Sequence, residues 1–200
     1  HIEEEVAHLS LALTPPPGAL AIIGGAKFET KEPLLQKLLT TYSEVLLGGA
    51  LGNDVLKARG LPIGASHVSD LAVPISIAGD TRLSVATDTV VRNSASNAER
   101  TALVVDTQIG EAIIDIGPTT AAAWAAKIAA APFVLWNGPM GIYELGFTQG
   151  TDVLANAIAT GTCKAVVGGG DTTAALKKFT FDPSRVFVST GGGAMLEFLV

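Results

Sequence analysis

The sequence predicts an α/β protein: a doubly wound, mostly parallel sheet with helices on both faces, arranged as a Rossmann-like three-layer sandwich. Three observations support this fold class. Apolar runs alternate with helical patterns from Leu20 onward. Four of these runs end in a glycine cluster that opens an expected helix. The composition, 48% hydrophobic with 22 glycines, suits a buried parallel sheet with tight turns.

The expected elements follow in chain order. Residues 3–13 carry apolar side chains at helical spacing and stop at the Pro-Pro-Pro-Gly segment, residues 15–18. The segments 61–79 and 93–100 show no strand or helix pattern, and the second is a polar loop. Strands are expected at 21–23, 45–47, 85–91, 101–106, 111–116, 133–136, 164–167 and 186–189, and helices at 33–39, 51–59, 119–131, 151–159, 172–178 and 194–199.

Composition and charge exclude several classes of protein. A net charge of −6 argues against nucleic acid as the main partner. No apolar run reaches the roughly 18–20 residues that span a bilayer. A single cysteine, Cys163, permits no intrachain disulfide; we interpret it as a packed thiol and expect a cytoplasmic protein. The acidic start at His1 is no secretory signal, and a first residue other than Met predicts a piece of a longer protein.

The segment Gly-Gly-Gly-Asp-Thr-Thr at residues 168–173 is the most informative. It follows an apolar run and precedes a helical one, so it is interpreted as a strand, a glycine turn and a helix. Glycine turns let backbone amides approach a phosphate. Asp171 lies where its carboxylate can hold a phosphate-bound Mg²⁺, which prefers oxygen ligands. The alternative is a plain tight turn.

The same strand–glycine–helix unit recurs at Gly24–Gly25, Gly48–Gly49 and residues 191–193. In a parallel sheet these turns share the edge formed by the carboxyl ends of the strands, where such sheets bind ligands. Lys27 and Lys31 flank the first turn, and both ammonium groups can face a polyphosphate. The alternative is two solvated surface lysines.

Residues 136–144, Trp-Asn-Gly-Pro-Met-Gly-Ile-Tyr-Glu, form a second candidate segment at a strand end. Glu144 can accept hydrogen bonds from both ribose hydroxyls, while Pro139 and Met140 can pack against a base. The alternative places Trp136 in the core, Asn137 in a turn and Glu144 on the surface. No P-loop motif is present, and no histidine pair has metal-ligand spacing. The second strand is followed by Gly48 rather than the acid that would hold an NAD ribose.

Together these segments resemble phosphoglycerate kinase, in that family's order and over nearly the whole chain. The resemblance is carried by Ile-Gly-Gly-Ala-Lys at 23–27 with Lys31, Gly48–Gly49 with Leu56–Lys57, Asp-Ile-Gly-Pro at 115–118, and the segments 136–144, 168–172 and 189–197. It is a resemblance to the C-terminal, nucleotide-binding half. It implies an interdomain hinge helix at residues 1–14 and a nucleotide-binding domain at 20–200.

The resemblance also implies reversible phosphoryl transfer between Mg-ATP and 3-phosphoglycerate in glycolysis, with ADP as the spent nucleotide and 3-phosphoglycerate bound by the absent N-terminal domain. It assigns Lys27 and the backbone of Gly191, Gly192 and Gly193 to the migrating phosphoryl group. The nucleotide-binding residues it implies are Gly25, Ala26, Lys31, Gly48, Gly49, Asn137, Gly138, Pro139, Glu144, Gly169, Gly170, Asp171 and Thr172, with Asp171 also the Mg²⁺ ligand.

This chain departs from the family pattern at several points. Ala50 replaces a glycine, Tyr143 replaces the usual Phe, and Thr30 stands where many members carry an acid. Residues 66–83 match poorly, so no role is transferred to them.

We expect a monomer that binds neither nucleic acid nor membrane and that, as this chain alone, binds nucleotide without catalysing transfer. A stand-alone adenine-nucleotide-binding module and an NAD-dependent dehydrogenase are the alternatives.

Overall fold

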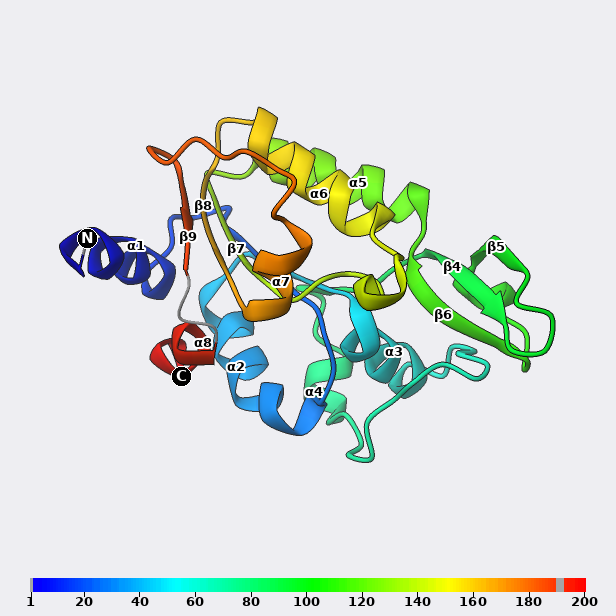
Figure 1. Ribbon diagram of the computed structural model, residues 1–200. Helices are drawn as coiled ribbons and strands as arrows, with labels where there is room; N and C mark the ends of the chain where they lie inside the picture. Colours follow the sequence, from blue (N-terminus) through cyan, green and yellow to red (C-terminus); the bar gives the residue numbers. More distant parts are fainter. Residues whose placement is uncertain (1, 190–192) are drawn as a thin grey trace.

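The computed structural model describes residues 2–189 and 193–200. Its centre is a six-stranded sheet in the order β3-β2-β1-β7-β8-β9, in which every neighbouring pair is parallel (Figure 1). The strands are β1 Leu20–Ile23, β2 Glu44–Leu47, β3 Leu83–Ser84, β7 Phe133–Asn137, β8 Lys164–Gly168 and β9 Val186–Val188.

Strand β1 shows why both faces of this sheet are covered. All four of its residues are buried. Leu20 and Ile22 belong to one hydrophobic cluster, whereas Ala21 and Ile23 belong to another. Because successive side chains of a strand point to opposite faces, an uninterrupted apolar strand needs a core on each side.

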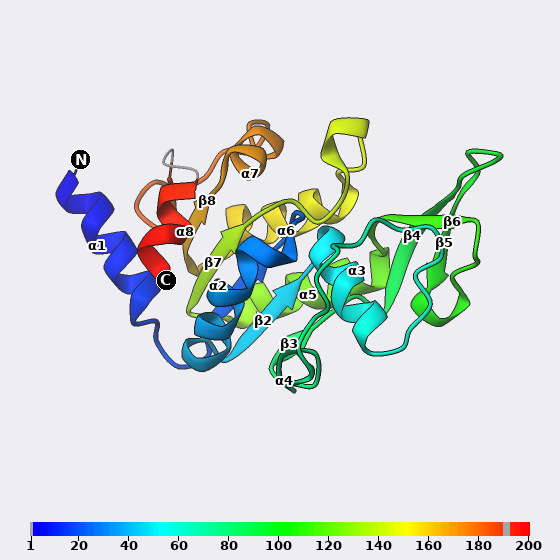
Figure 2. The same cartoon turned by 90° about the horizontal axis from the view of Figure 1, so that it is seen from below.

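Helices supply those two cores (Figures 1 and 2). One cluster holds side chains of α1, α2, α3, α4 and α8, and the other holds side chains of α5 and α6. The fold class predicted from the sequence is therefore confirmed. The helices are α1 Ile2–Leu13, α2 Phe28–Thr41, α3 Gly49–Ala58, α4 Ile75–Ala78, α5 Pro118–Ala130, α6 Gln149–Thr160, α7 Gly170–Ala175 and α8 Gly193–Leu199, with 3-10 turns η1 Val104–Asp106 and η2 Tyr143–Leu145.

A separate three-stranded antiparallel sheet, which the sequence analysis did not foresee, projects from one end of the molecule (Figure 1). It comprises β4 Asp88–Asn93, β5 Glu99–Leu103 and β6 Glu111–Ile116. The strand expected at 85–91 is only partly present: β3 ends before it, at Ser84, residues 85–87 lie outside any strand, and residues 88–91 belong to β4 in the small sheet. The polar loop expected at 93–100 is shorter than expected: residue 93 ends β4, residues 99 and 100 begin β5, and residues 94–98 form the hairpin turn. The Asn93 side chain stabilises this turn by accepting hydrogen bonds from the amides of Ala95 and Ser96.

Two of the contacts that pack helix α1 against the rest of the chain are a ring stack and a hydrogen bond. The His8 ring stacks on Phe187, with centroids 4.9 Å apart. The Tyr42 hydroxyl donates to the backbone oxygen of Ala12 at 2.7 Å. The division into a hinge at 1–14 and a domain at 20–200 stays a prediction.

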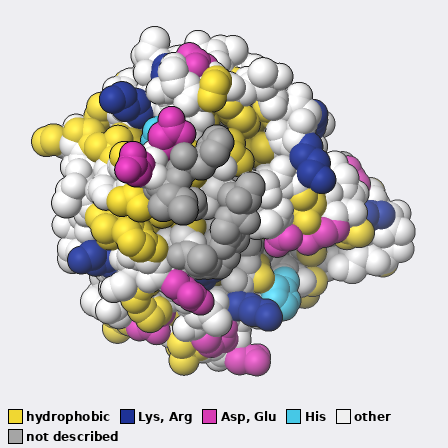
Figure 3. All heavy atoms as spheres, turned by 60° about the vertical axis from the view of Figure 1, so that its left-hand side comes forward, with side chains coloured by type: hydrophobic (Ala, Val, Ile, Leu, Met, Phe, Trp, Pro, Cys, Tyr) yellow, Lys and Arg dark blue, Asp and Glu magenta, His cyan; other side chains and the backbone are white. Residues whose placement is uncertain are grey.

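The surface and the helices add two observations. Figure 3 shows Lys and Arg side chains spaced apart from one another on the face that it displays, with Asp and Glu among them. Within residues 2–189 and 193–200, no helix is long and apolar enough to cross a membrane.

Asp88, at the start of β4, joins the small sheet to α5. Its Oδ1 accepts from the Thr120 amide at 2.7 Å and from the Thr120 hydroxyl at 2.6 Å, and its Oδ2 accepts from the Thr119 amide at 3.0 Å. The carboxylate thereby caps the first turn of α5 from another element. Burial tends to raise the pKa of Asp88, but the hydrogen bonds from Thr120 and Thr119 outweigh it and lower the pKa below its usual value.

We expect Asp88→Ala to lower the free energy of unfolding by about 1–3 kcal/mol, because buried amides lose their acceptor. The lowered pKa means that this contribution is present above the unfolded value of 3.8 and is lost as pH falls through the folded value. Urea unfolding at pH 7 measures the loss. Asp80→Ala, which removes the ion pair with the half-exposed Arg82, is the control and should cost less than about 1 kcal/mol. Equal losses for the two variants would contradict the capping role.

Candidate functional site

The candidate site lies at the carboxyl edge of the main sheet, beside β1. The chain runs outward from β1 through β2 to β3 on one side, and from β7 through β8 to β9 on the other. The strand order therefore reverses between β1 and β7. In open α/β sheets, such a switch point is the usual ligand-binding crevice. The loops that follow β1 and β7 meet at this point and line two cavities.

The first cavity, of about 230 Å³, is the more polar of the two and is called the polar cavity below. Glycines form much of its wall, so backbone groups rather than side chains face its interior. Among the described residues that line it, Lys31 alone carries a positive charge. Its lining comprises Gly24, Gly25, Ala26, Lys31, Asn137, Gly138, Pro139, Gly169, Gly170, Asp171, Thr172 and Leu196.

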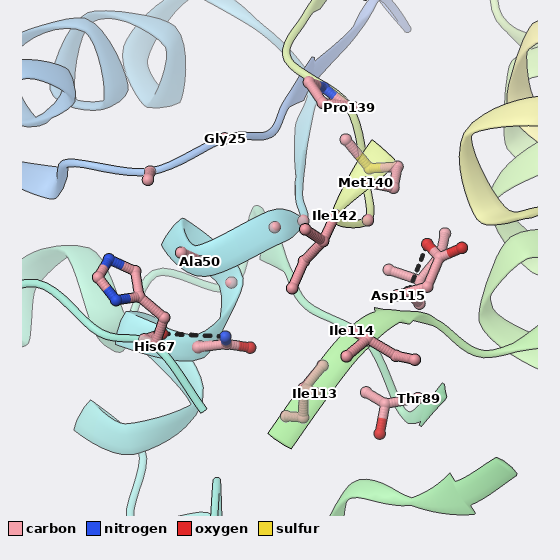
Figure 4. A pocket seen from close by; sticks show the side chains of 18 of the residues that line it. Gly25, Ala50, His67, Thr89, Ile113, Ile114, Asp115, Pro139, Met140 and Ile142 are labelled. Atoms are coloured by element: carbon pink, nitrogen blue, oxygen red, sulfur yellow. Dashed lines mark hydrogen bonds between the residues drawn. The ribbon is translucent and has the colours of Figure 1, made fainter. Parts of the chain in front are cut away.

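The second is a larger, mainly apolar cavity of about 450 Å³ (Figure 4). Pro139, Met140 and Ile142 approach it from the loop after β7, and Figure 4 shows Ile113 and Ile114 on the strand opposite them. The glycines of the loop after β2 and the side chains of Asn53, His67 and Glu144 complete much of the lining. A cavity of this size and character suits a flat, partly apolar ligand.

The two cavities are adjacent, because Gly25, Ala26, Pro139 and Asp171 line both. The junction thus combines a glycine-rich turn, a proline ring and a carboxylate. One ligand with an apolar end and an anionic end would occupy both cavities at once.

Hydrogen bonds tie the loop after β7 to its neighbours. The Gly49 amide, after β2, donates to the backbone oxygen of Met140 at 3.2 Å. The Gly138 amide donates to the hydroxyl of Thr172, in α7, at 2.6 Å. The walls of the two cavities are therefore mechanically linked.

Asn137 uses both its backbone and its side chain to hold this edge together. Its backbone oxygen accepts from the Gly24 amide at 2.8 Å, and its side-chain Nδ2 donates to the Gly168 oxygen at 3.0 Å. The residue is 5% exposed. Asn137 lines the polar cavity while it joins the loop after β1 to the last residue of β8, so it also has a structural role.

The Tyr143 hydroxyl donates to Asp171 Oδ1 at 3.1 Å. This bond joins the 3-10 turn η2 to α7 across the junction of the cavities. The resemblance described above leads one to expect Phe at this position, and the hydrogen bond gives the hydroxyl of Tyr143 a partner. The phenol also places a hydrogen-bond donor on the carboxylate that we expect to hold Mg²⁺.

The two predicted lysines are placed differently. Lys31, in the first turns of α2, lines the polar cavity, and burial lowers the pKa of its ammonium group. A bound anion would offset that penalty. Lys27 is exposed, immediately precedes α2 and lines neither cavity.

All thirteen residues expected to bind nucleotide line at least one cavity. Gly191 and Gly192 lie outside the described residues, and Gly193 opens α8. The individual roles of these residues stay predictions.

The apolar wall contains residues that the sequence analysis did not assign, chiefly Ile113 and Ile114 of β6 and Asn53, Leu56, Ala65 and His67. Ile113 and Ile114 come from the small sheet, and Ala65 and His67 come from a segment that lay outside the predicted site; Asn53 and Leu56 lie in α3, behind the predicted glycine turn after β2. The sequence did contain one indication that β6 lies near the site, because Asp-Ile-Gly-Pro at 115–118, which includes the end of β6, was part of the family resemblance.

The residues present fit a phosphate-bound Mg²⁺. Within residues 2–189 and 193–200, no three His, Cys, Asp or Glu side chains come together to hold a metal ion. Mg²⁺ at nucleotide sites usually needs one or two carboxylates, with phosphates and water supplying the other ligands. The exposed carboxylate of Asp171, at the junction of the cavities, meets that requirement.

The whole of this chain is similar in sequence to known proteins. The sequence model of a family described as phosphoglycerate kinase matches residues 1–200. A phosphoglycerate kinase of Coxiella burnetii is 40% identical over 206 residues, covering 98% of this chain and 53% of the relative. One of Solibacter usitatus is 40% identical over 204 residues, covering 99% and 52%.

Solved structures agree with the sequence relatives. That of phosphoglycerate kinase from Coxiella burnetii matches with a TM-score of 0.89 and 37% identity, over 99% of this chain and 54% of that one. Phosphoglycerate kinase from Pyrococcus horikoshii OT3 matches with a TM-score of 0.84 and 25% identity, over 99% and 53%. This chain spans about half the length of the curated relatives it matches.

Asp115, at the end of β6, is a buried carboxylate in the wall of the larger cavity. Its oxygens accept from the amides of Ile116 and Gly150, each at 2.9 Å. Burial raises the pKa of Asp115 to about 6, although these two hydrogen bonds oppose the rise, and the charge of Asp152 adds to it.

We expect Asp115→Asn to change how stability depends on pH. The folded-state pKa of about 6 exceeds the unfolded value of 3.8, so the unfolded chain loses this proton first. The contribution of Asp115 to wild-type stability therefore falls as pH rises from about 4 to 6, by on the order of 3 kcal/mol at ~1.4 kcal/mol per pH unit. The asparagine does not titrate, so unfolding free energies should shift in favour of the variant over this range. A difference that stays constant from pH 4 to pH 7 would contradict the expectation.

Proposed function

Since the chain belongs to the phosphoglycerate kinase family, we propose that it forms the nucleotide-binding half of a two-domain enzyme. That enzyme transfers a phosphoryl group reversibly between Mg-ATP and 3-phosphoglycerate in glycolysis. The observation that carries the proposal is the adjacency of an apolar and a polar cavity at the switch point of the sheet. The second half of the enzyme binds 3-phosphoglycerate.

The larger cavity receives the nucleoside. Pro139, Met140, Ile113 and Ile114 provide apolar contact for the base. Glu144 accepts hydrogen bonds from the ribose hydroxyls. The glycines of the loop after β2 let the nucleoside approach the backbone closely.

The polar cavity receives the phosphates. Lys31 pairs with them, and Gly169, Gly170 and Thr172 line their path. Asp171 holds Mg²⁺, which when bound neutralises phosphate charge. Lys27 and the glycines at 191–193 meet the migrating phosphoryl group. Phosphoryl transfer asks the protein mainly to position groups and stabilise charge, and this set of residues is suited to that task.

We expect this chain by itself to bind Mg-ADP and Mg-ATP and to lack transfer activity, because catalysis requires a bound acceptor and the exclusion of water. Calorimetric titration and an assay for 3-phosphoglycerate-dependent ATP turnover test both parts. Absence of nucleotide binding at millimolar concentration would refute the site. Turnover by this chain would refute the proposed division of labour.

The proposal also includes the partners, the cellular location and the oligomeric state of the protein. The net charge of −6 and the spaced cations of the face in Figure 3 support a partner other than nucleic acid. We propose a cytoplasmic monomer that does not associate with membranes. A stand-alone nucleotide-binding module is the competing function; joining the chain to the half that its relatives carry, without gain of turnover, would favour it.

Gly170→Ala separates binding from folding. A Cβ at Gly170 would meet no atom within 4 Å, yet the residue lines the polar cavity. We expect an unfolding free energy within about 1 kcal/mol of the wild type. Mg-ADP affinity should fall about ten-fold or more, because the methyl group occupies phosphate space.

Gly110→Ala is the matched control, since its Cβ would also have room, with Asn93 Nδ2 at 3.7 Å, and it lines neither cavity. Calorimetry on both variants makes the comparison. Unchanged affinity in Gly170→Ala would remove the polar cavity from the phosphate path.

A further inference from the structure

Helix α2 begins with a hydrogen bond from a distant segment. The amide of Phe28, its first residue, donates to the Ser69 hydroxyl oxygen at 3.0 Å. Lys27, the residue before the helix, makes no side-chain capping bond of its own. Ser69 belongs to residues 66–83, the segment to which the family resemblance transferred no role.

Asp54, in α3, holds Ser69 in place. Its Oδ1 accepts from the Ser69 amide at 2.7 Å, and its Oδ2 accepts from the Ser69 hydroxyl at 2.9 Å. Asp54 is 4% exposed. Because the hydroxyl proton is directed at a buried carboxylate, the oxygen of Ser69 presents its lone pairs to the Phe28 amide.

The peptide group between Lys27 and Phe28 is thereby held at both polar ends. Its N–H donates to Ser69, as above. Its carbonyl oxygen, on Lys27, accepts from the Thr30 amide at 3.2 Å and from the Thr30 hydroxyl at 3.0 Å.

The backbone of Lys27 needs this support. It has φ 66° and ψ 74°, a left-handed conformation that is uncommon and strained for a residue other than glycine. Such a conformation persists where surrounding contacts determine it. It also sets the direction in which the Lys27 side chain leaves the backbone.

We propose that Asp54 and Ser69 are positioning residues that fix the backbone of Lys27 and so aim its ammonium group. The inference rests on the proposed role of Lys27 in meeting the migrating phosphoryl group. Asp54 and Ser69 line neither of the two cavities described above, so they act through Lys27 rather than on the nucleotide. A second hydrogen bond joins the start of α2 to the same segment, since Glu29 Oε1 accepts from the Leu71 amide at 3.3 Å.

The first test uses the complete two-domain enzyme. Ser69→Ala should lower kcat about 10- to 100-fold, the scale of a misplaced reacting group, and change the nucleotide KM less than two-fold. Ser69→Thr, which keeps the hydroxyl, should restore most of kcat, and Asp54→Asn should act in the direction of Ser69→Ala.

Ser184→Ala is the matched control. Ser184 donates from its amide and hydroxyl to Asp182, at 2.9 and 2.7 Å, in the turn before β9 at the opposite edge of the sheet. It should leave kcat unchanged. Unchanged kcat in Ser69→Ala, or a fall in kcat that Ser69→Thr does not reverse, would overturn the inference.

A double variant separates positioning from general damage. If Ser69 acts through Lys27, adding Ser69→Ala to Lys27→Ala should cause no further loss of kcat. Multiplying losses would show a purely structural role and overturn the inference. If Lys27→Ala alone leaves turnover unchanged, the proposed role of Lys27 fails instead.

A second measurement needs no activity and uses this 200-residue chain. In Ser69→Ala, hydrogen exchange of the Phe28 amide, followed by NMR, should accelerate at least ten-fold relative to Ser184→Ala. Unchanged protection at Phe28 would show that Ser69 does not hold this peptide group, whatever the kinetics.

Discussion

The backbone-to-backbone approach of the loops after β1 and β7 determines the shape of the site. A Cβ on Gly24 would lie 2.1 Å from the Pro139 oxygen, and one on Gly138, where φ is 98°, would lie 2.3 Å from the Gly24 oxygen. No other residue type fits at either position. The loop after β7 then contacts the loops after β2 and β8, so this one approach fixes the walls of both cavities.

The electrostatic character of the site follows from this construction. The chain as a whole carries a net charge of −6. Among the described residues that line the polar cavity, Lys31 is the one with a positive charge, and its burial disfavours the charged form of its side chain. In the proposed function, affinity for a polyphosphate therefore depends on backbone amides and on a metal ion as much as on lysines.

Sequence reasoning predicted the parts of the fold that depend on local pattern. Apolar runs such as Leu20–Ile23 indicated the strands. The glycine turns after these runs indicated which edge of the sheet holds the loops of the polar cavity. Strands were expected near β4, β5 and β6, but their pairing as a separate antiparallel sheet was missed because the polar run between β4 and β5 has no periodicity, and its turn depends on the Asn93 side chain. Ile113 and Ile114 reach the cavity only through tertiary packing. Asp54 and Ser69 are fifteen residues apart, and no periodic pattern in the sequence indicates that their side chains pair.

The indole of Trp136 gives this architecture an optical consequence. The ring is fully buried, and its Nε1 donates to the Gly138 oxygen at 2.7 Å. The chain's other tryptophan, Trp124, is 4% exposed on α5 in the same cluster. Indole emission responds to the polarity and hydrogen bonding around the ring, so a shift of the Gly138 carbonyl alters the fluorescence of a neighbouring chromophore. Trp136 is thus an intrinsic fluorophore that is hydrogen-bonded to the loop that shapes both cavities. Movements of this loop can be followed without a label.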